Sequence, residues 1–153
     1  MNALRTPILI ALVFVAGVLA SGPAQAEEVC IPIKAKGEGY FTGPTSTASR
    51  LIGGGNLQGT TTADLEITGV VGPGVVSYDG TLVLTTKQGT LTLSIINGVY
   101  DTTTGEFSND SVVTAGTGRF AGASGGLYFH GFVFPDGTFF DDEISGQICV
   151  EVP

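Results

Sequence analysis

Apolar and polar residues alternate along much of this 153-residue chain. Leu91, Leu93 and Ile95 share one face of an extended segment, and the Thr and Ser residues between them occupy the other face. The same pattern recurs over 62–68 and 82–86, without the sustained spacing of three and four residues that marks an amphipathic helix. A period of two is typical of strands that bury one face. The sequence therefore predicts an all-β protein with little helix.

Turn-forming residues separate the extended segments at Asp79-Gly80, Lys87-Gln88-Gly89, Asn97-Gly98 and Pro135-Asp136-Gly137. Because Gly and Asn accept positive φ and Pro presets a turn, each of these places indicates a hairpin or a bulge. The segments expected to be extended are 29–36, 38–43, 56–70, 75–87, 90–98, 106–115, 124–134 and 138–151. The longest and most mobile loop is expected at 43–55, which is rich in Gly, Ser and Thr. This number of strands is usual for a small antiparallel barrel or a sandwich.

The first 26 residues have the features of a secretory signal peptide. Arg5 precedes the apolar run Ile8–Leu19, and Ala24-Gln25-Ala26 has the small-x-small form that signal peptidase cleaves. A membrane anchor would need about 20 consecutive apolar residues, and Ser21-Gly22-Pro23 interrupts this run. We therefore expect a secreted or periplasmic protein that has no membrane anchor after cleavage.

Two cysteines, Cys30 and Cys149, lie near the two ends of the remaining chain. Export delivers them to a compartment in which disulfides persist, so we expect a Cys30–Cys149 bond rather than two separate thiols. Such a bond requires the first and last strands to be neighbours, which favours a closed barrel; a sandwich with paired terminal strands would also satisfy it. Residues 27–153 are thus expected to form a single antiparallel β-barrel domain of about eight strands.

The charge and the motifs exclude several partners and cofactors. The formal net charge is −8, and it becomes more negative when the signal peptide is removed, so nucleic acid and anionic lipid surfaces are not expected partners. Gly116, Gly118 and Ala121 match a dinucleotide-binding pattern, but a strand follows where a phosphate site needs a helix. No His or Cys cluster has zinc spacing, so neither a cofactor nor a metal is expected. Asn109-Asp110-Ser111 fits a glycosylation sequon, on which we expect no glycan.

Residues 116–125 read Gly-Thr-Gly-Arg-Phe-Ala-Gly-Ala-Ser-Gly. This turn resembles the Gly-Thr-Gly-x-Phe-x-Gly-Ala-x-Gly turn of the allene oxide cyclase and dirigent barrel superfamily, which includes bacterial secreted members of undefined function. The resemblance implies an eight-stranded, calycin-like barrel. Phe120 is then expected to plug one barrel end, while the glycines let the backbone reverse tightly. The active-site residues of the superfamily do not map onto this chain one by one, so none is carried over.

Three residues are weak candidates for a catalytic role inside such a barrel. His130 is the single histidine and shares strand parity with Tyr128, so an imidazole beside aromatic rings offers a general acid or base; a structural or half-exposed histidine is the commoner case. Asp142 is the member of the acidic cluster 141–143 that shares a face with Phe140. Buried, it would have a raised pKa and could act on a ligand. The commoner outcome, which we expect here, is a carboxylate at the solvated rim.

Two functions are compatible with these features. The first is an exported, non-catalytic barrel that binds a small apolar molecule or a protein surface. The second is a barrel enzyme, similar to allene oxide cyclases or dirigent proteins, that guides the cyclisation or coupling of an apolar substrate. The enzyme requires a cavity lined by at least two polar groups, whereas a filled interior excludes catalysis and internal binding alike.

Overall fold

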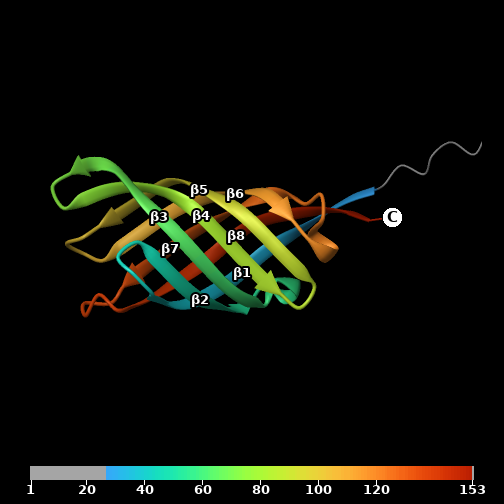
Figure 1. The fold of residues 1–153 in the computed structure, drawn as a ribbon, viewed down its shortest axis with the longest axis horizontal. Coiled ribbons are helices and arrows are strands. Elements are labelled where there is room, and N and C mark those ends of the chain that lie inside the picture. The colour runs from blue at the N-terminus through green and yellow to red at the C-terminus, as the bar shows by residue number, and fades with distance from the viewer. Residues whose placement is uncertain (1–26, 153) are drawn as a thin grey trace, which may run out of the picture.

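The computed structural model describes residues 27–152 of the chain, and these form a closed barrel of eight antiparallel strands (Figure 1). Each strand pairs with its neighbours in the sequence, and the last returns to pair with the first, so no strand edge is left open. The strands are β1 (Glu27–Phe41), β2 (Ser46–Gly53), β3 (Gly59–Gly72), β4 (Val75–Thr86), β5 (Gly89–Asp101), β6 (Glu106–Gly116), β7 (Ser124–Val133) and β8 (Phe139–Val152). The prediction of an all-β, closed antiparallel barrel is confirmed.

Two short 3-10 turns interrupt the connections between strands, η1 (Gly55–Leu57) after β2 and η2 (Gly118–Phe120) after β6. The predicted signal peptide, residues 1–26, lies outside the described residues. Across 27–152, no helix is long and apolar enough to cross a membrane.

The first third of the barrel differs from the sequence prediction. The strand β1 runs unbroken through Gly37, where two separate strands were expected, and β2 lies inside the segment 43–55 that was expected to be a loop. The polar segment β2 forms a stable strand because its backbone pairs with β1 on one side and with β3 on the other. A hydrogen bond between the hydroxyls of Ser49 and Thr61 (2.6 Å) adds to the pairing with β3.

The turn-forming residues divide into hairpins and bulges. The strands β4 and β5 meet in a tight hairpin at Lys87-Gln88, and Pro135-Asp136-Gly137 lies in the connection between β7 and β8. By contrast, Asp79-Gly80 and Asn97-Gly98 lie within strands, where the register shifts by a residue or more. Asn97 adopts a φ of 54°, a conformation that Asn tolerates better than most residues. Two residues of β5, Ile96 and Asn97, oppose the single residue Asp79 of β4, so the bulge lies in β5 and bends that strand, whereas Asp79-Gly80 pairs with β3 in unbroken register.

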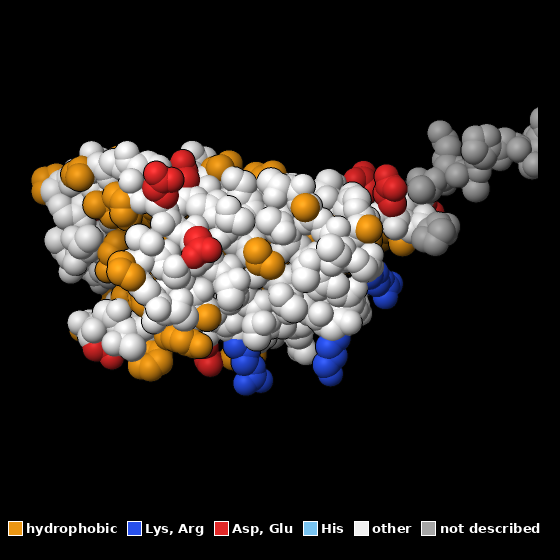
Figure 2. Space-filling view, in the orientation of Figure 1, with side chains coloured by type: hydrophobic (Ala, Val, Ile, Leu, Met, Phe, Trp, Pro, Cys, Tyr) orange, Lys and Arg blue, Asp and Glu red, His pale blue; other side chains and the backbone are white. Residues whose placement is uncertain are grey.

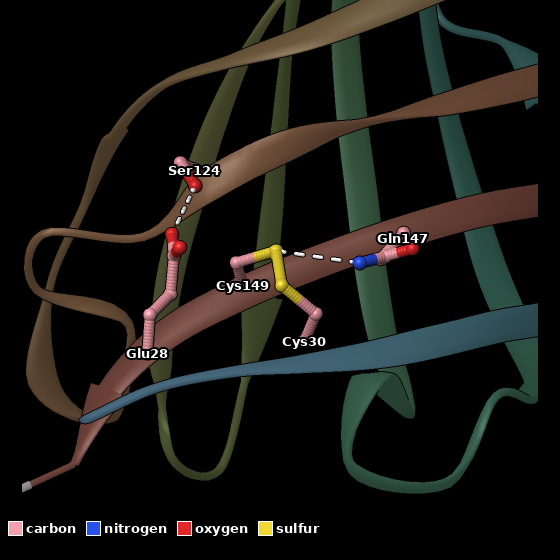
Figure 3. The surroundings of a disulfide bond; sticks show 5 residues. All are labelled: Glu28, Cys30, Ser124, Gln147 and Cys149. Atoms are coloured by element: carbon pink, nitrogen blue, oxygen red, sulfur yellow. Dashed lines mark hydrogen bonds between the residues drawn. A yellow bond between two sulfur atoms is a disulfide. The ribbon is translucent and has the colours of Figure 1, made fainter.

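The predicted disulfide is confirmed at the seam where β1 meets β8. Cys30 lies directly opposite Cys149 in the register of the two strands, and their sulfur atoms are bonded across a sequence separation of 119 residues. Figure 3 shows the bond between the two ribbons. A disulfide in this position is consistent with an oxidising, extracytoplasmic compartment.

The two ends of the barrel are packed differently. Around the end that holds the chain termini, at the right of Figure 1, apolar side chains fill the interior: Ile33, Leu57, Leu84, Leu91, Leu93, Phe120 and Ile148. Phe120 is 4 % exposed and comes from η2, so the expectation that it plugs one end is confirmed. The opposite end, formed by the connections β1–β2, β3–β4, β5–β6 and β7–β8, is not filled in this way.

Candidate functional site

A pocket with a volume of about 190 Å³ occupies the unfilled half of the barrel. All eight strands contribute to its lining, and so does the β1–β2 connection through the exposed residues Pro44 and Thr45. The pocket is therefore accessible from the end of the barrel opposite the termini. An apolar cavity of about 150 Å³ is enough to hold a benzene-sized molecule. The volume thus suits a ligand with one ring and a short substituent.

Aromatic side chains form much of the pocket wall: Phe41, Tyr78, Tyr100, Phe107, Phe129 and Phe140. Phe140 makes edge-to-face contacts with Phe41 and with Phe107, with ring centroids 5.8 Å apart in each case. Contacts of this geometry are favourable beyond simple burial and fix the orientation of the rings. The wall is therefore apolar and well ordered in its packing.

One carboxyl group, that of Asp142, lies in this apolar surrounding. The residue is 8 % exposed and lines the pocket, so the expectation that it sits at the solvated rim is wrong. Its neighbours across the sheet are Gly37 on β1 and Gly131 on β7. A Cβ atom at Gly37 would overlap Asp142 Oδ1, and one at Gly131 would crowd Asp142 Cβ. Two glycines therefore provide the space that holds the carboxyl group inside.

The environment of Asp142 disfavours its charged form. Burial raises the pKa of Asp142 to about 6; the backbone N–H of Gly37 opposes this shift, and the nearby charge of Asp141 adds to it. Within residues 27–152, Asp142 Oδ1 has no hydrogen-bond partner. A buried acceptor without a donor costs stability.

The other buried polar groups of the pocket region bond to one another. Asn109 Nδ2 donates to Tyr78 Oη (3.0 Å), Ser111 Oγ donates to Asn109 Oδ1 (3.0 Å), and Tyr78 Oη donates to the carbonyl of Ser108 (3.3 Å). Burial raises the pKa of Tyr78 to about 12; the bond from Asn109 opposes this shift and the charge of Asp142 adds to it. Tyr78 is therefore a neutral phenol, and its O–H already donates a hydrogen bond to the carbonyl of Ser108.

Tyr78 and Asn109 are residues of the pocket that no sequence motif marks as site residues. Tyr78 has the strand parity of Leu82 and Leu84, which could have indicated an inward position. Asn109 was interpreted only as part of a sequon, and its side chain is 7 % exposed, so it is inaccessible to glycosylation in the folded barrel.

The other two candidates lie on the outside of the barrel. His130 is exposed and Tyr128 is 43 % exposed, because the inward positions of β7 are taken by Leu127, Phe129 and Val133. Both border a surface groove lined by residues of β1, β2, β7 and β8. Neither residue contacts the internal pocket, so neither can act on a molecule bound there.

Two further groups of side chains near the disulfide have the composition of a chemical site. Among residues 27–152, the one cluster of possible metal ligands is Glu28, Cys30 and Cys149, whose two sulfurs are bonded to each other. Residues 122–126 have the Gly-x-Ser-x-Gly spacing of a nucleophile elbow. Ser124 begins a strand rather than a strand-to-helix turn, and its hydroxyl donates to Glu28 Oε1 at 3.1 Å (Figure 3). Neither group forms a catalytic or metal site.

The fold and the pocket together define a closed eight-stranded antiparallel β-barrel with an accessible aromatic pocket and one buried carboxyl group in it. Comparison of the chain with protein-family models, with curated proteins and with solved structures finds no match.

Proposed function

We propose that the protein is an exported binding barrel whose pocket takes a small apolar molecule. The observation that carries this proposal is the aromatic pocket of about 190 Å³ that is accessible from one barrel end. Apolar pockets with a few polar groups are the usual form of small-molecule sites. The signal-like segment at 1–26 and the Cys30–Cys149 bond support export.

The size of the pocket favours small ligands. Pockets for drug-sized molecules commonly measure about 300 to 1,000 Å³, and this one is smaller. The buried part of the ligand is therefore close to a single ring in size. A long-chain lipid would have to leave most of its length outside.

A pair of matched variants tests this function. Ala63 lines the pocket and is 7 % exposed, so Ala63→Leu adds bulk inside it, whereas Ala115→Leu makes the same change at an exposed position of β6. Binding of ethylbenzene, followed by ligand-detected NMR, should be weakened at least tenfold by the first variant and unchanged by the second. Equal binding by both variants would contradict the proposal. Native mass spectrometry of protein purified from its own host would then identify the natural ligand.

A second candidate function is a barrel enzyme that guides cyclisation or coupling of an apolar substrate. Two observations favour it: the turn at 116–125 resembles that of allene oxide cyclases and dirigent proteins, and the polar groups that line the pocket include the ionisable side chains of Asp142 and Tyr78. The small volume of the pocket and the engaged hydroxyl of Tyr78 make it the weaker candidate. Enantiomeric excess in the cyclisation of an unsaturated lipid epoxide, lost in Asp142→Asn, would establish it; a racemic product with the native protein would exclude this cyclisation.

A further inference from the structure

The polar groups around the pocket leave one unmet requirement. Asn109 and Tyr78 bond to each other, and the hydroxyls of Ser49 and Thr61 do the same. Within the described part of the chain, Asp142 Oδ1 is left without a partner. An ionised carboxylate accepts hydrogen bonds and donates none. A ligand that satisfies this pocket must therefore carry a donor at its buried end.

The aromatic rings next to Asp142 favour a positively charged donor. A Cβ atom at Gly131 would collide with both Phe107 Cζ and Asp142 Cβ, so the tip of this ring and the carboxyl-bearing side chain lie over the same glycine. The ring of Phe140, which also lines the pocket, packs edge-to-face against that of Phe107. The faces of aromatic rings attract ammonium groups, most strongly where water is excluded.

The pocket offers no positive charge to an anionic ligand. Its lining includes no Lys, Arg or His. A carboxylate or phosphate on the ligand would meet the charge of Asp142 in an apolar surrounding, where like charges repel strongly. Fatty acids and phosphorylated molecules are thus poor candidates.

The charged residues at the accessible end of the barrel also favour a positively charged ligand. The connections that form this end are flanked by or contain Asp101, Glu106 and Asp136, and they have no basic residue. Lys87 and Arg119 lie in connections at the opposite end. Figure 2 shows no Lys or Arg at the left end of the barrel, where hydrophobic side chains gather. An entrance with this charge raises the local concentration of cations.

We infer that the pocket binds a small organic ammonium ion, a primary or secondary amine on an aromatic or short aliphatic frame, whose positive charge pairs with the carboxylate of Asp142 in the pocket wall. This inference rests on the proposed function, the binding of a small molecule in the aromatic pocket, and adds a charged group to the otherwise apolar ligand. Three independent features support it: an unpartnered buried acceptor, an aromatic wall without basic residues, and an acidic entrance.

Four probes of similar size test the inference: benzylamine, benzyl alcohol, ethylbenzene and benzoate. Their dissociation constants for the intact protein would be measured by calorimetry or NMR titration at pH 7.5. Benzylamine should bind at least tenfold more tightly than ethylbenzene, and benzoate should bind least. Asp142→Asn should abolish the preference for benzylamine while ethylbenzene still binds. Asp79→Asn, which removes an exposed carboxylate on β4, should keep the preference.

The outcomes separate the ligand class from the function. Equal binding of benzylamine and ethylbenzene, or tighter binding of benzyl alcohol, would overturn the ammonium inference and leave an apolar pocket. A preference that persists in Asp142→Asn would also overturn it, because Asp142 would not be the acceptor. If none of the four probes binds and Ala63→Leu changes nothing, the proposed function fails as well.

Discussion

Replacement of Asp142 by Asn should stabilise the protein at neutral and alkaline pH. Burial raises the pKa of Asp142 from 3.8 to about 6, so the folded state holds the proton more tightly than the unfolded state does. Protonated Asp142 makes its full contribution to the free energy of unfolding below about pH 4, and this contribution is lost as the pH rises through 6. Each pKa unit corresponds to about 1.4 kcal/mol, so the ionised group costs the folded state about 3 kcal/mol at pH 8.

The assay is chemical denaturation of the native protein and of Asp142→Asn at pH 4 and pH 8. The variant should gain about 2.5 kcal/mol relative to the native protein between the two pH values, or on the order of 10 °C in Tm, because part of the shift is already expressed at pH 4. Any cost of placing an amide against Gly37 lowers the unfolding free energy of the variant equally at both pH values. The change in relative stability between pH 4 and pH 8 is therefore unaffected. The exposed carboxylate Asp79 serves as the control, since Asp79→Asn should show no comparable gain.

A stability difference between Asp142→Asn and the native protein that stays constant from pH 4 to pH 8 would refute the reasoning. It would mean that the carboxyl group titrates in the folded protein as it does in the unfolded chain. The description of Asp142 as a carboxyl group whose charged form is disfavoured by burial would then be wrong.

Three further predictions concern the frame around the pocket. Replacing Cys30 and Cys149 with Ala should lower the unfolding free energy by about 4 to 5 kcal/mol in denaturant titrations, because the bond closes a long loop; unchanged stability would contradict this. Phe120→Ala should cost about 3 to 5 kcal/mol, because the ring closes the filled end, and should leave ethylbenzene binding intact; lost binding would show that the two halves are coupled. Gly37→Ala should cost more than about 1 kcal/mol because its Cβ overlaps Asp142 Oδ1. The double variant with Asp142→Ser should recover most of that loss, and no recovery would point to a backbone effect.

Much of the barrel could be predicted from local patterns. The alternation in β3, β4 and β5 predicted their apolar faces correctly, because a period of two is a local pattern that does not depend on which strands pair. The cysteines supplied the long-range pairing of β1 with β8. The polar strand β2 was missed because its stability comes from backbone pairing on both sides, which Ser and Thr side chains do not reveal.

The site was harder to predict because it depends on register between distant segments. Parity showed that Asp142 faces the side of Phe140, but its burial depends on Gly37 and Gly131, which become its neighbours only when the barrel closes. For His130, parity gave two possible faces. Aromatic neighbours such as Tyr128 suggested the inner one, whereas in the structure they are on the outside.

The position of the disulfide also determines how the barrel responds to mechanical force. Cys30 and Cys149 lie within a few residues of the ends of β1 and β8. A force applied to the two ends of the domain would be transmitted through the covalent bond. The chain between the two cysteines, which are 119 residues apart in the sequence, could therefore not be extended. In an optical trap, the oxidised protein should thus extend very little under load. Reduction of the disulfide should allow the force to act on the strands of the barrel and on its pocket.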